Sequence, residues 1–325
     1  MKKSPRLAMI VPLLGLLALI FPAHVIPASA QTLVRVGTPG AVTGAIPIYL
    51  GVKKGIFQKH GLNAEVIATR NEQMNMQALI SDSVQFLTSS STGLFYLGKQ
   101  GIDVVGLCSW SNASPYSLAS RFKIKEVKEL KGNKIASSGA GGRADAFIRF
   151  MLAKAGLDYR KDAQIIPLSG GSGIRLAAVI SGNIDATLIS PLQGRHAEKL
   201  GLTVIPLPLE YIWGINLTRK SFLEKNRGVV RAYIRALAES VRALIADKET
   251  TIAVMQRVLR IEDRESLEYS YGLLKEGARP DLVPTDEAIV NVLKTMSYED
   301  PAFASIPPFK YFDLSFIEEL KAERR

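Results

Sequence analysis

Four short segments combine glycine with serine or threonine, and each runs into a predicted helix. They are TPGAVTGA (38–45), TSSSTG (88–93), SSGAGGR (137–143) and SPLQG (190–194). A helix start offers unpaired backbone N–H groups and a partial positive charge, and hydroxyl groups add further donors. The segments contain no Asp or Glu, and Arg143 is their only formal charge. This chemistry suits a small anion. The alternative is that these residues only cap helices and form turns.

The third segment also fits the loose dinucleotide fingerprint G-x-G-x-x-A, through Gly139, Gly141 and Ala144. A dinucleotide site needs an acidic residue near the end of the next strand to hold the ribose. That strand, QIIPLSG, ends at Ser169 and Gly170. We therefore expect these glycines to let helix N–H groups approach a small anion and not a dinucleotide.

The sequence does not support catalysis or metal binding. Beyond residue 30, the two histidines, His60 and His196, form no zinc-type spacing with the single cysteine, Cys108. Ser172 in GGSGI is one residue out of register for a nucleophile elbow, and paired carboxylates near the four segments are absent. We expect a binding protein that is not an enzyme and needs no cofactor or metal.

The first thirty residues have the pattern of a signal peptide. Lys2, Lys3 and Arg6 precede an apolar run, and Ala28-Ser29-Ala30 forms a small-x-small cleavage site. The predicted first residue after cleavage is Gln31, whereas a lipoprotein would have Cys there. The sequence predicts export through a cleavable signal peptide to the periplasm, as a soluble protein that is not a lipoprotein.

The remaining 295 residues are long for one core and natural for two domains. The net charge is +11, of which the predicted signal peptide supplies +3. Basic and acidic residues are interspersed without an aromatic-basic strip, so we expect no nucleic-acid partner. A lone cysteine excludes an intrachain disulfide.

Strand-like and helix-like segments alternate up to about residue 218, which predicts parallel sheets in an α/β fold. The strand-like runs span 32–38, 64–69, 84–89, 104–109, 134–138, 164–169, 184–190, 202–208 and 213–218. From 221 onward the pattern is helical. We predict two doubly wound lobes around a central cleft, with the C-terminal helices on the first lobe. Lobe 1 would comprise 31–115 plus 213–325, and lobe 2 would comprise 116–212.

In open parallel sheets, ligands bind beyond the carboxyl ends of the strands, which is where the four segments lie. Two tryptophans near the predicted crossings between the lobes could contact the rest of the ligand, or could serve core or hinge packing. The candidate ligand-binding residues are Thr43, Ser89, Ser90, Ser91, Trp110, Ser138, Gly139, Arg143, Pro191 and Trp213.

Three stretches carry a family resemblance. GTPGAVTGAIPIYLGVKKGIFQKHGLNAEVI (37–67) resembles the opening of substrate-binding proteins of ABC importers of the nitrate/sulfonate/taurine type, the SsuA/THI5-like or NMT1 family. Gly55, Phe57, Gly61, Leu62 and Glu65 meet its G-x-F-x-x-x-G-L-x-x-E pattern. LKGNKIASSGAGGRADAFIRFMLAKAGLDYRKDAQIIPL (130–168) resembles the opening of the family's second lobe. AAVISGNIDATLISP (177–191) is similar to the family's Ala-x-x-x-x-Gly-x-Ile-Asp-Ala segment, which includes Asp185.

The resemblance implies a type II periplasmic binding fold that closes on its ligand, with an ABC permease and its ATPase in the inner membrane as partners. The expected solute is small and anionic, like a sulfonate, nitrate or taurine. A thiamine-pyrimidine-type ligand stays an alternative, as does an exported enzyme or sensor on the same fold. A monomer is expected.

Overall fold

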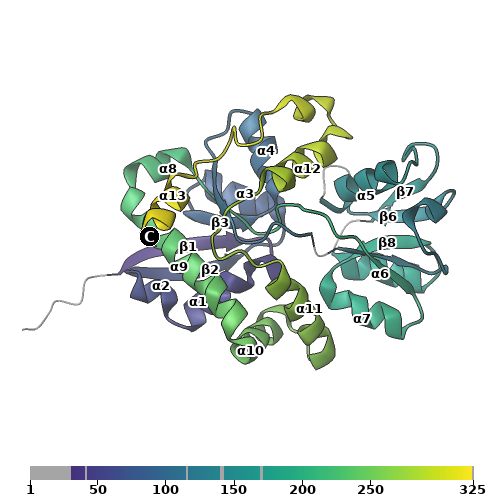
Figure 1. Ribbon diagram of the computed structural model, residues 1–325, viewed down its shortest axis with the longest axis horizontal. Helices are drawn as coiled ribbons and strands as arrows, with labels where there is room; N and C mark the ends of the chain where they lie inside the picture. The colour runs from purple at the N-terminus through teal and green to yellow at the C-terminus, as the bar shows by residue number, and fades with distance from the viewer. Residues whose placement is uncertain (1–30, 41, 115, 140–142, 169–170, 324–325) are drawn as a thin grey trace, which may run out of the picture. The chain divides into compact units, whose positions relative to one another are not determined.

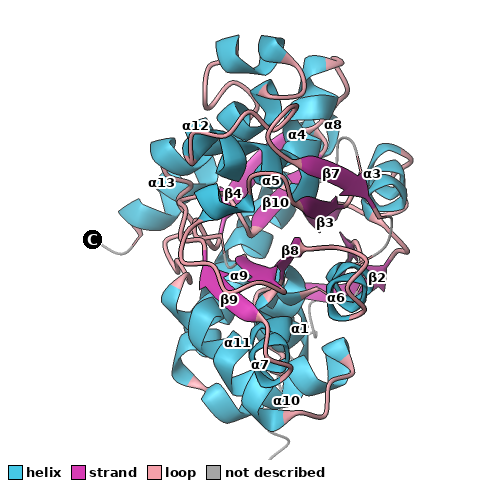
Figure 2. Cartoon of the chain, turned by 90° about the vertical axis from the view of Figure 1, so that its right-hand side faces the viewer, coloured by secondary structure: helices cyan, strands magenta, loops and turns pink. Residues whose placement is uncertain are grey.

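Two mixed five-stranded sheets, each flanked by helices, organise the chain in the computed structural model (Figures 1 and 2). The structure describes residues 31–40, 42–114, 116–139, 143–168 and 171–323. The predicted signal peptide lies outside the described residues. We call the parts built on the two sheets the first lobe and the second lobe.

The first sheet has the strand order β2-β1-β3-β10-β4. Strand β1 pairs in parallel with β2 and β3, whereas β10 runs antiparallel between β3 and β4. The strands are β1 Thr32–Thr38, β2 Leu62–Ala68, β3 Phe86–Ser89, β4 Val105–Ser109 and β10 Ile215–Thr218.

The second sheet repeats this arrangement in the order β7-β6-β8-β5-β9. Strand β6 pairs in parallel with β7 and β8, and β5 runs antiparallel between β8 and β9. The strands are β5 Ser117–Ser120, β6 Lys134–Ser137, β7 Gln164–Pro167, β8 Ala186–Ile189 and β9 Thr203–Pro206.

The helices fill the spaces between strands and form the C-terminal part. Up to β9 they are η1 Thr43–Ala45, α1 Ile46–Lys53, α2 Ile56–Lys59, α3 Glu72–Ile80, α4 Ser91–Lys99, η2 Val127–Leu130, α5 Arg143–Lys154, α6 Ser172–Ile180 and α7 Pro191–Lys199. After β10 they are α8 Lys220–Lys225, α9 Arg227–Ala246, α10 Lys248–Leu259, α11 Arg264–Glu276, α12 Asp286–Ser297, η3 Pro301–Ser305 and α13 Ser315–Ala322. Among the described residues, no helix combines the length and apolarity that a membrane span requires.

The two-lobed α/β fold is confirmed, but the expectation of parallel sheets is wrong for one strand in each sheet. The sequence missed β5 because Ser117–Ser120 is short and built largely of small residues, without a β-branched run. All four residues are buried, so small side chains suit a strand enclosed between two neighbours.

The C-terminal helices pack mainly on the first lobe, as predicted. Helix α9 lies against α1 and α2, and α13 lies against α9 (Figure 1). Two of these helices also reach the second lobe, since α11 packs against α7 and α12 packs against α5. At the first of these contacts Lys199 Nζ is 2.5 Å from Glu265 Oε2, and the Arg195 guanidinium lies 5.1 Å from the Tyr269 ring centroid.

Two backbone segments cross between the lobes side by side. We call 110–116 the first crossing and 207–214 the second crossing. The two segments run antiparallel and are joined by backbone hydrogen bonds. Trp213 N donates to Ser111 O at 2.9 Å, Tyr211 N to Asn112 O at 2.8 Å, and Ser114 N to Leu209 O at 2.9 Å. The lobe boundaries at 115/116 and 212/213 remain predictions, and residue 115 lies outside the described residues.

Asp185, which the family resemblance includes, joins three strand ends of the second sheet. Its carboxylate accepts hydrogen bonds from Arg121 Nε and from Lys134 N, both at 2.7 Å. Burial raises the pKa of Asp185, but the hydrogen bonds from Lys134 and Arg121 outweigh burial, so this pKa is lowered below its ordinary value. The residue therefore has a structural function at the start of β8.

We predict that Asp185→Asn lowers the free energy of unfolding at pH 7 by about 2 kcal/mol, because hydrogen bonds to a charged group are lost. Because the pKa of Asp185 is lowered in the folded state, its carboxylate stabilises the folded protein at pH values above the unfolded-state pKa of about 3.9. This stabilisation is lost as the pH falls further. The difference between wild type and variant should therefore shrink below about pH 4. Urea unfolding at several pH values measures it. The exposed Glu224→Gln is the charge-matched control, and a difference that does not change with pH would contradict the assignment.

Candidate functional site

Aromatic side chains of the two crossings meet beside α5. Trp213 of the second crossing packs edge to face on Tyr116 of the first, with ring centroids 5.1 Å apart. Tyr116 in turn packs on Phe147 of α5 at 5.4 Å. Trp213 is 8% exposed. The backbone pairing of the crossings fixes these rings, and the second lobe reaches them through α5.

Arg143, the first residue of α5, joins the two lobes at this point. Its Nε donates a hydrogen bond of 3.2 Å to Ser90 Oγ, and Ser90 lies directly after β3 of the first lobe. The Arg143 guanidinium carbon is 4.5 Å from the Trp213 ring centroid, which is a cation–π contact. We call Ser90, Tyr116, Arg143 and Trp213 the junction cluster. Three of its members come from widely separated predicted segments.

The indole N–H of Trp213 is buried and has no hydrogen-bond partner among the described residues. A side chain at position 44 would place its Cβ 4.0 Å from this nitrogen. Because residue 44 is glycine, it leaves the space beside the Trp213 N–H open. An unsatisfied buried donor costs about 1–3 kcal/mol, and native proteins contain few of them. A hydrogen-bond acceptor supplied by a ligand would remove this cost.

A carboxylate that the sequence did not predict lies at the same site. Glu72, the first residue of α3, accepts a hydrogen bond of 3.0 Å from the backbone N–H of Ser90. The amide of Ser90 is thus paired with an acid, although TSSSTG (88–93) itself contains none. Only tertiary structure could reveal this contact, because Glu72 lies 18 residues before Ser90.

Arg175 is a second cation that the sequence did not single out. It lies in the first turn of α6 and is 4% exposed. Burial lowers the pKa of Arg175, and the nearby Tyr116 raises it in part. A buried guanidinium near the junction cluster adds positive charge to the region where an anion would bind. Its position just after the run Gly170-Gly171-Ser172-Gly173 was the feature of the sequence that could have marked Arg175 as a candidate.

Several predicted residues make structural contacts here. The Ser91 hydroxyl is buried and donates to Ile212 O at 3.1 Å, which fixes the second crossing to α4. Trp110 is 1% exposed, and its Nε1 donates to Gly44 O at 3.1 Å. These contacts support the packing alternative for Ser91 and Trp110. Thr43 is buried in η1, next to Gly44.

The other predicted residues lie at helix starts. Ser138 Oγ accepts a hydrogen bond from Asp145 N of α5, and Gly139 has a φ of +90°, which favours glycine. Pro191 begins α7. The start of α7 lies beside the start of α6, since a side chain at position 173 would place its Cβ 3.6 Å from Gln193 Nε2. Whether these residues contact a ligand stays a prediction. Residues 140–142 and the side chain of Ser89 lie outside the described part of the chain.

The described residues contain no group of three or more His, Cys, Asp and Glu side chains that could hold a metal ion. His196 is exposed on α7, and His60 lies 2.9 Å from Glu239 Oε2 on α9. The arrangement of the junction cluster suits recognition by hydrogen bonds, positive charge and aromatic contact.

The two tryptophans allow a matched test, because within the described part of the chain only the Trp110 indole N–H has a hydrogen-bond partner. We predict that Trp110→Phe lowers the free energy of unfolding more than Trp213→Phe does, with a difference of about 1–2 kcal/mol between the two losses. Both variants lose similar buried volume, but only Trp110→Phe breaks a hydrogen bond, and it leaves Gly44 O with the Thr88 hydroxyl at 3.3 Å as its remaining donor. Denaturant unfolding of the unliganded protein measures both values. Equal losses would show that the Trp213 N–H has a partner.

Comparisons with known proteins identify the family and the fold of the chain. The model of the NMT1/THI5-like family matches residues 42–251, about two thirds of the chain. A Brucella abortus protein named "Putative binding protein" is 26% identical over 244 residues, which are 72% of this chain and 74% of its own.

Two solved structures share the fold. The aliphatic sulphonate binding protein SsuA from Escherichia coli has a TM-score of 0.67 and 18% identity, with 86% of this chain and 91% of that chain covered. The nitrate-binding protein NrtA from Synechocystis PCC 6803 has a TM-score of 0.66 and 16% identity, with 90% and 89% covered. The resemblance found in the sequence is confirmed, and the chain belongs to the NMT1/THI5-like family.

Proposed function

We propose that this protein is the solute-binding component of an ABC importer and that it binds a small organic or inorganic anion at the junction cluster. It would bind and release its solute unchanged, and deliver it to a membrane permease that is driven by an ATPase. The family, the two-lobed fold and the names of the similar structures support this proposal.

The observation that carries the proposal is the Trp213 N–H, which has no hydrogen-bond partner among the described residues and lies in a ring beside the Arg143 guanidinium. Arg143 comes from the second lobe, whereas Ser90 comes from the first. A ligand that accepts hydrogen bonds from both Arg143 and Trp213 would interact with the two lobes at once. Binding would then favour the arrangement in which the lobes are close, since a ligand shifts a conformational equilibrium toward the state that it binds better.

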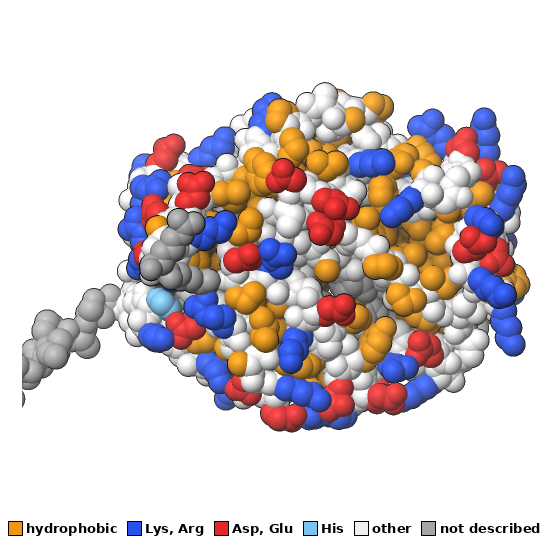
Figure 3. Space-filling view, in the orientation of Figure 1, with side chains coloured by type: hydrophobic (Ala, Val, Ile, Leu, Met, Phe, Trp, Pro, Cys, Tyr) orange, Lys and Arg blue, Asp and Glu red, His pale blue; other side chains and the backbone are white. Residues whose placement is uncertain are grey.

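The proposed location is the periplasm. The pattern of residues 1–30 supports export, and Gln31 in place of Cys supports a soluble protein without a lipid anchor. Figure 3 shows basic and acidic side chains interspersed on the face in view, which fits a protein that binds a small solute rather than nucleic acid.

A ligand screen tests the proposal, with Arg143→Gln as the key variant. The panel contains nitrate, alkanesulfonates, taurine, carboxylates and pyrimidines, and isothermal titration measures the dissociation constant. We expect at least one anion to bind, and we expect Arg143→Gln to raise its dissociation constant roughly 10- to 100-fold, as for hydrogen bonds to a charged group.

Arg257→Gln, an exposed change of equal charge on α10, is the control and should leave the dissociation constant unchanged. The chain has two tryptophans, Trp110 and Trp213, so intrinsic fluorescence should also change on binding. If no anion binds, or if both arginine variants weaken binding equally, the proposal is wrong.

Glu72 favours a second class of solute, one that carries a hydrogen-bond donor as well as an acceptor. Such solutes include an aminosulfonate and an aminopyrimidine of the thiamine-precursor type. Taurine and ethanesulfonate differ by one ammonium group and therefore form a matched pair. If a donor faces Glu72, Glu72→Gln should weaken taurine binding about 10-fold relative to ethanesulfonate. If Glu72→Gln leaves the ratio of the two dissociation constants unchanged, Glu72 only accepts the hydrogen bond from Ser90 N at the start of α4 and does not contact the solute.

A further inference from the structure

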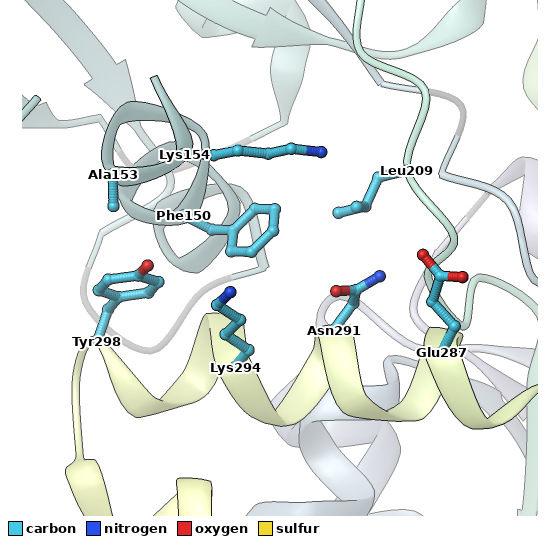
Figure 4. Close-up of a pocket in the computed structure, with 8 residues that line it drawn as sticks. All are labelled: Phe150, Ala153, Lys154, Leu209, Glu287, Asn291, Lys294 and Tyr298. Carbon is cyan, nitrogen blue, oxygen red and sulfur yellow. The ribbon is translucent and has the colours of Figure 1, made fainter. Parts of the chain in front are cut away.

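Two adjoining cavities lie apart from the junction cluster, on either side of Phe150, Lys154 and Leu209. The first, which we call the α5–α12 pocket, has a volume of about 290 Å³ and lies between α5, α12 and the second crossing (Figure 4). The second, the Pro206–Leu209 pocket, has a volume of about 330 Å³ and lies between α5, η2 and the second crossing. Phe150, Lys154 and Leu209 line both cavities, so the two cavities adjoin each other.

The α5–α12 pocket carries two lysines, one from each lobe. Lys154 extends from α5 across the pocket, and Lys294 rises from α12 toward Phe150 (Figure 4). Lys294 Nζ is 5.9 Å from the Phe150 ring centroid, and Phe150 packs on Tyr298 at 6.4 Å. In the part of the chain that the structure describes, neither lysine forms an ion pair. The pocket therefore offers two positive charges beside aromatic rings, and neither is held in an ion pair within the described residues.

The remaining polar groups orient a ligand in this pocket. Asn291 Nδ2 already donates to Glu210 O at 2.9 Å. The carboxylate of Glu287 lies at the Leu209 side (Figure 4). A negative charge near Glu287 would be repelled, so an anionic group is favoured only near Lys154 and Lys294. A ligand with one anionic group fits this distribution of charge, and a ligand with two separated anionic groups does not.

The Pro206–Leu209 pocket is apolar apart from Lys154. Its walls include Phe147, Met151 and the run Pro206-Leu207-Pro208-Leu209. Burial of apolar surface contributes to affinity in proportion to the area removed from water. Each cavity is close to the lower limit of about 300 Å³ for small-molecule sites. This part of the site therefore suits a short alkyl chain or a single ring.

We propose that the two pockets together bind one amphiphilic organic anion, with its anionic group between Lys154 and Lys294 and its apolar body in the Pro206–Leu209 pocket. The occupant is a small molecule of the size of octanoate. An apolar cavity thus adjoins two lysines that, among the described residues, form no ion pair. This site shares no residue with the junction cluster, although Phe147 in its wall packs on Tyr116, and it does not depend on the solute proposed above.

Titration calorimetry with octanoate tests this proposal. We expect one octanoate per protein, with a dissociation constant on the order of 1 mM or below for a ligand of this size. Octanol, which lacks the charge, and acetate, which lacks the chain, should bind at least about 10-fold more weakly, since one interaction worth about 1.4 kcal/mol changes affinity tenfold.

The double variant Lys154→Gln/Lys294→Gln should weaken octanoate binding about 10-fold or more. Lys225→Gln/Lys275→Gln, two exposed lysines on α8 and α11, removes the same charge and should leave binding unchanged. Both double variants should unfold at the wild-type temperature, because these lysines are exposed and, within the described ranges, form no ion pairs.

Three results would overturn the proposal. The first is an absence of octanoate binding to the wild-type protein, and the second is equal weakening in both lysine double variants. The third is octanoate binding that Arg143→Gln abolishes and Lys154→Gln/Lys294→Gln does not affect, since octanoate would then occupy the junction cluster. That third result would support the proposed solute site, so the two proposals fail separately.

Discussion

The contact between Arg143, Ser90 and Trp213 is the interaction on which the proposed site depends. It joins a helix start in one lobe to a strand end in the other, with an aromatic ring beneath the guanidinium. An arginine at this position has five N–H donors and makes one described hydrogen bond, so it has donors in reserve. Together with the unpaired indole N–H, these donors define a place where an anion would be better bound than in water.

The same region also contains a carboxylate, and this reduces the number of backbone N–H groups that the start of α4 can donate to an anion. Glu72 pairs with the Ser90 amide, so the first N–H of that turn is not available to an anion. The anionic group of a solute is therefore better served by the second-lobe side, at Arg143 and near the buried Arg175. Charge is thus unevenly distributed across the junction, and a polar solute would be oriented by it.

Much of the fold followed from periodicity and from the four glycine- and hydroxyl-rich segments. The β1 boundaries agree with the predicted ones, because an alternating apolar run is a local signal. β5 was missed, since Ser117–Ser120 has little local preference and is a strand because of its neighbours. The antiparallel direction of β10 could not be predicted either, because it depends on how the second crossing returns to the first sheet.

The candidate site was predicted only in part for the same reason. Ser90, Arg143 and Trp213 lay in segments that local sequence marks, and the structure brings them together. The sequence does not show that the Ser91 hydroxyl and the Trp110 N–H are used by backbone carbonyls, or that Glu72 approaches Ser90. These facts depend on contacts between residues 18 to 121 positions apart.

The course of the two crossings has a mechanical consequence. The first runs from β4, at the edge of one sheet, to β5, inside the other, and the second runs from β9, at an edge, to β10, inside the first sheet. Each interior strand is held by neighbours on both sides, so strand slippage cannot absorb a rotation of one lobe relative to the other. The rotation must instead be taken up as torsion within the crossings, which carry Tyr116 and Trp213. Substitutions that change the stiffness of the crossings would therefore also change the geometry of the proposed site, so that the two properties would be coupled in evolution.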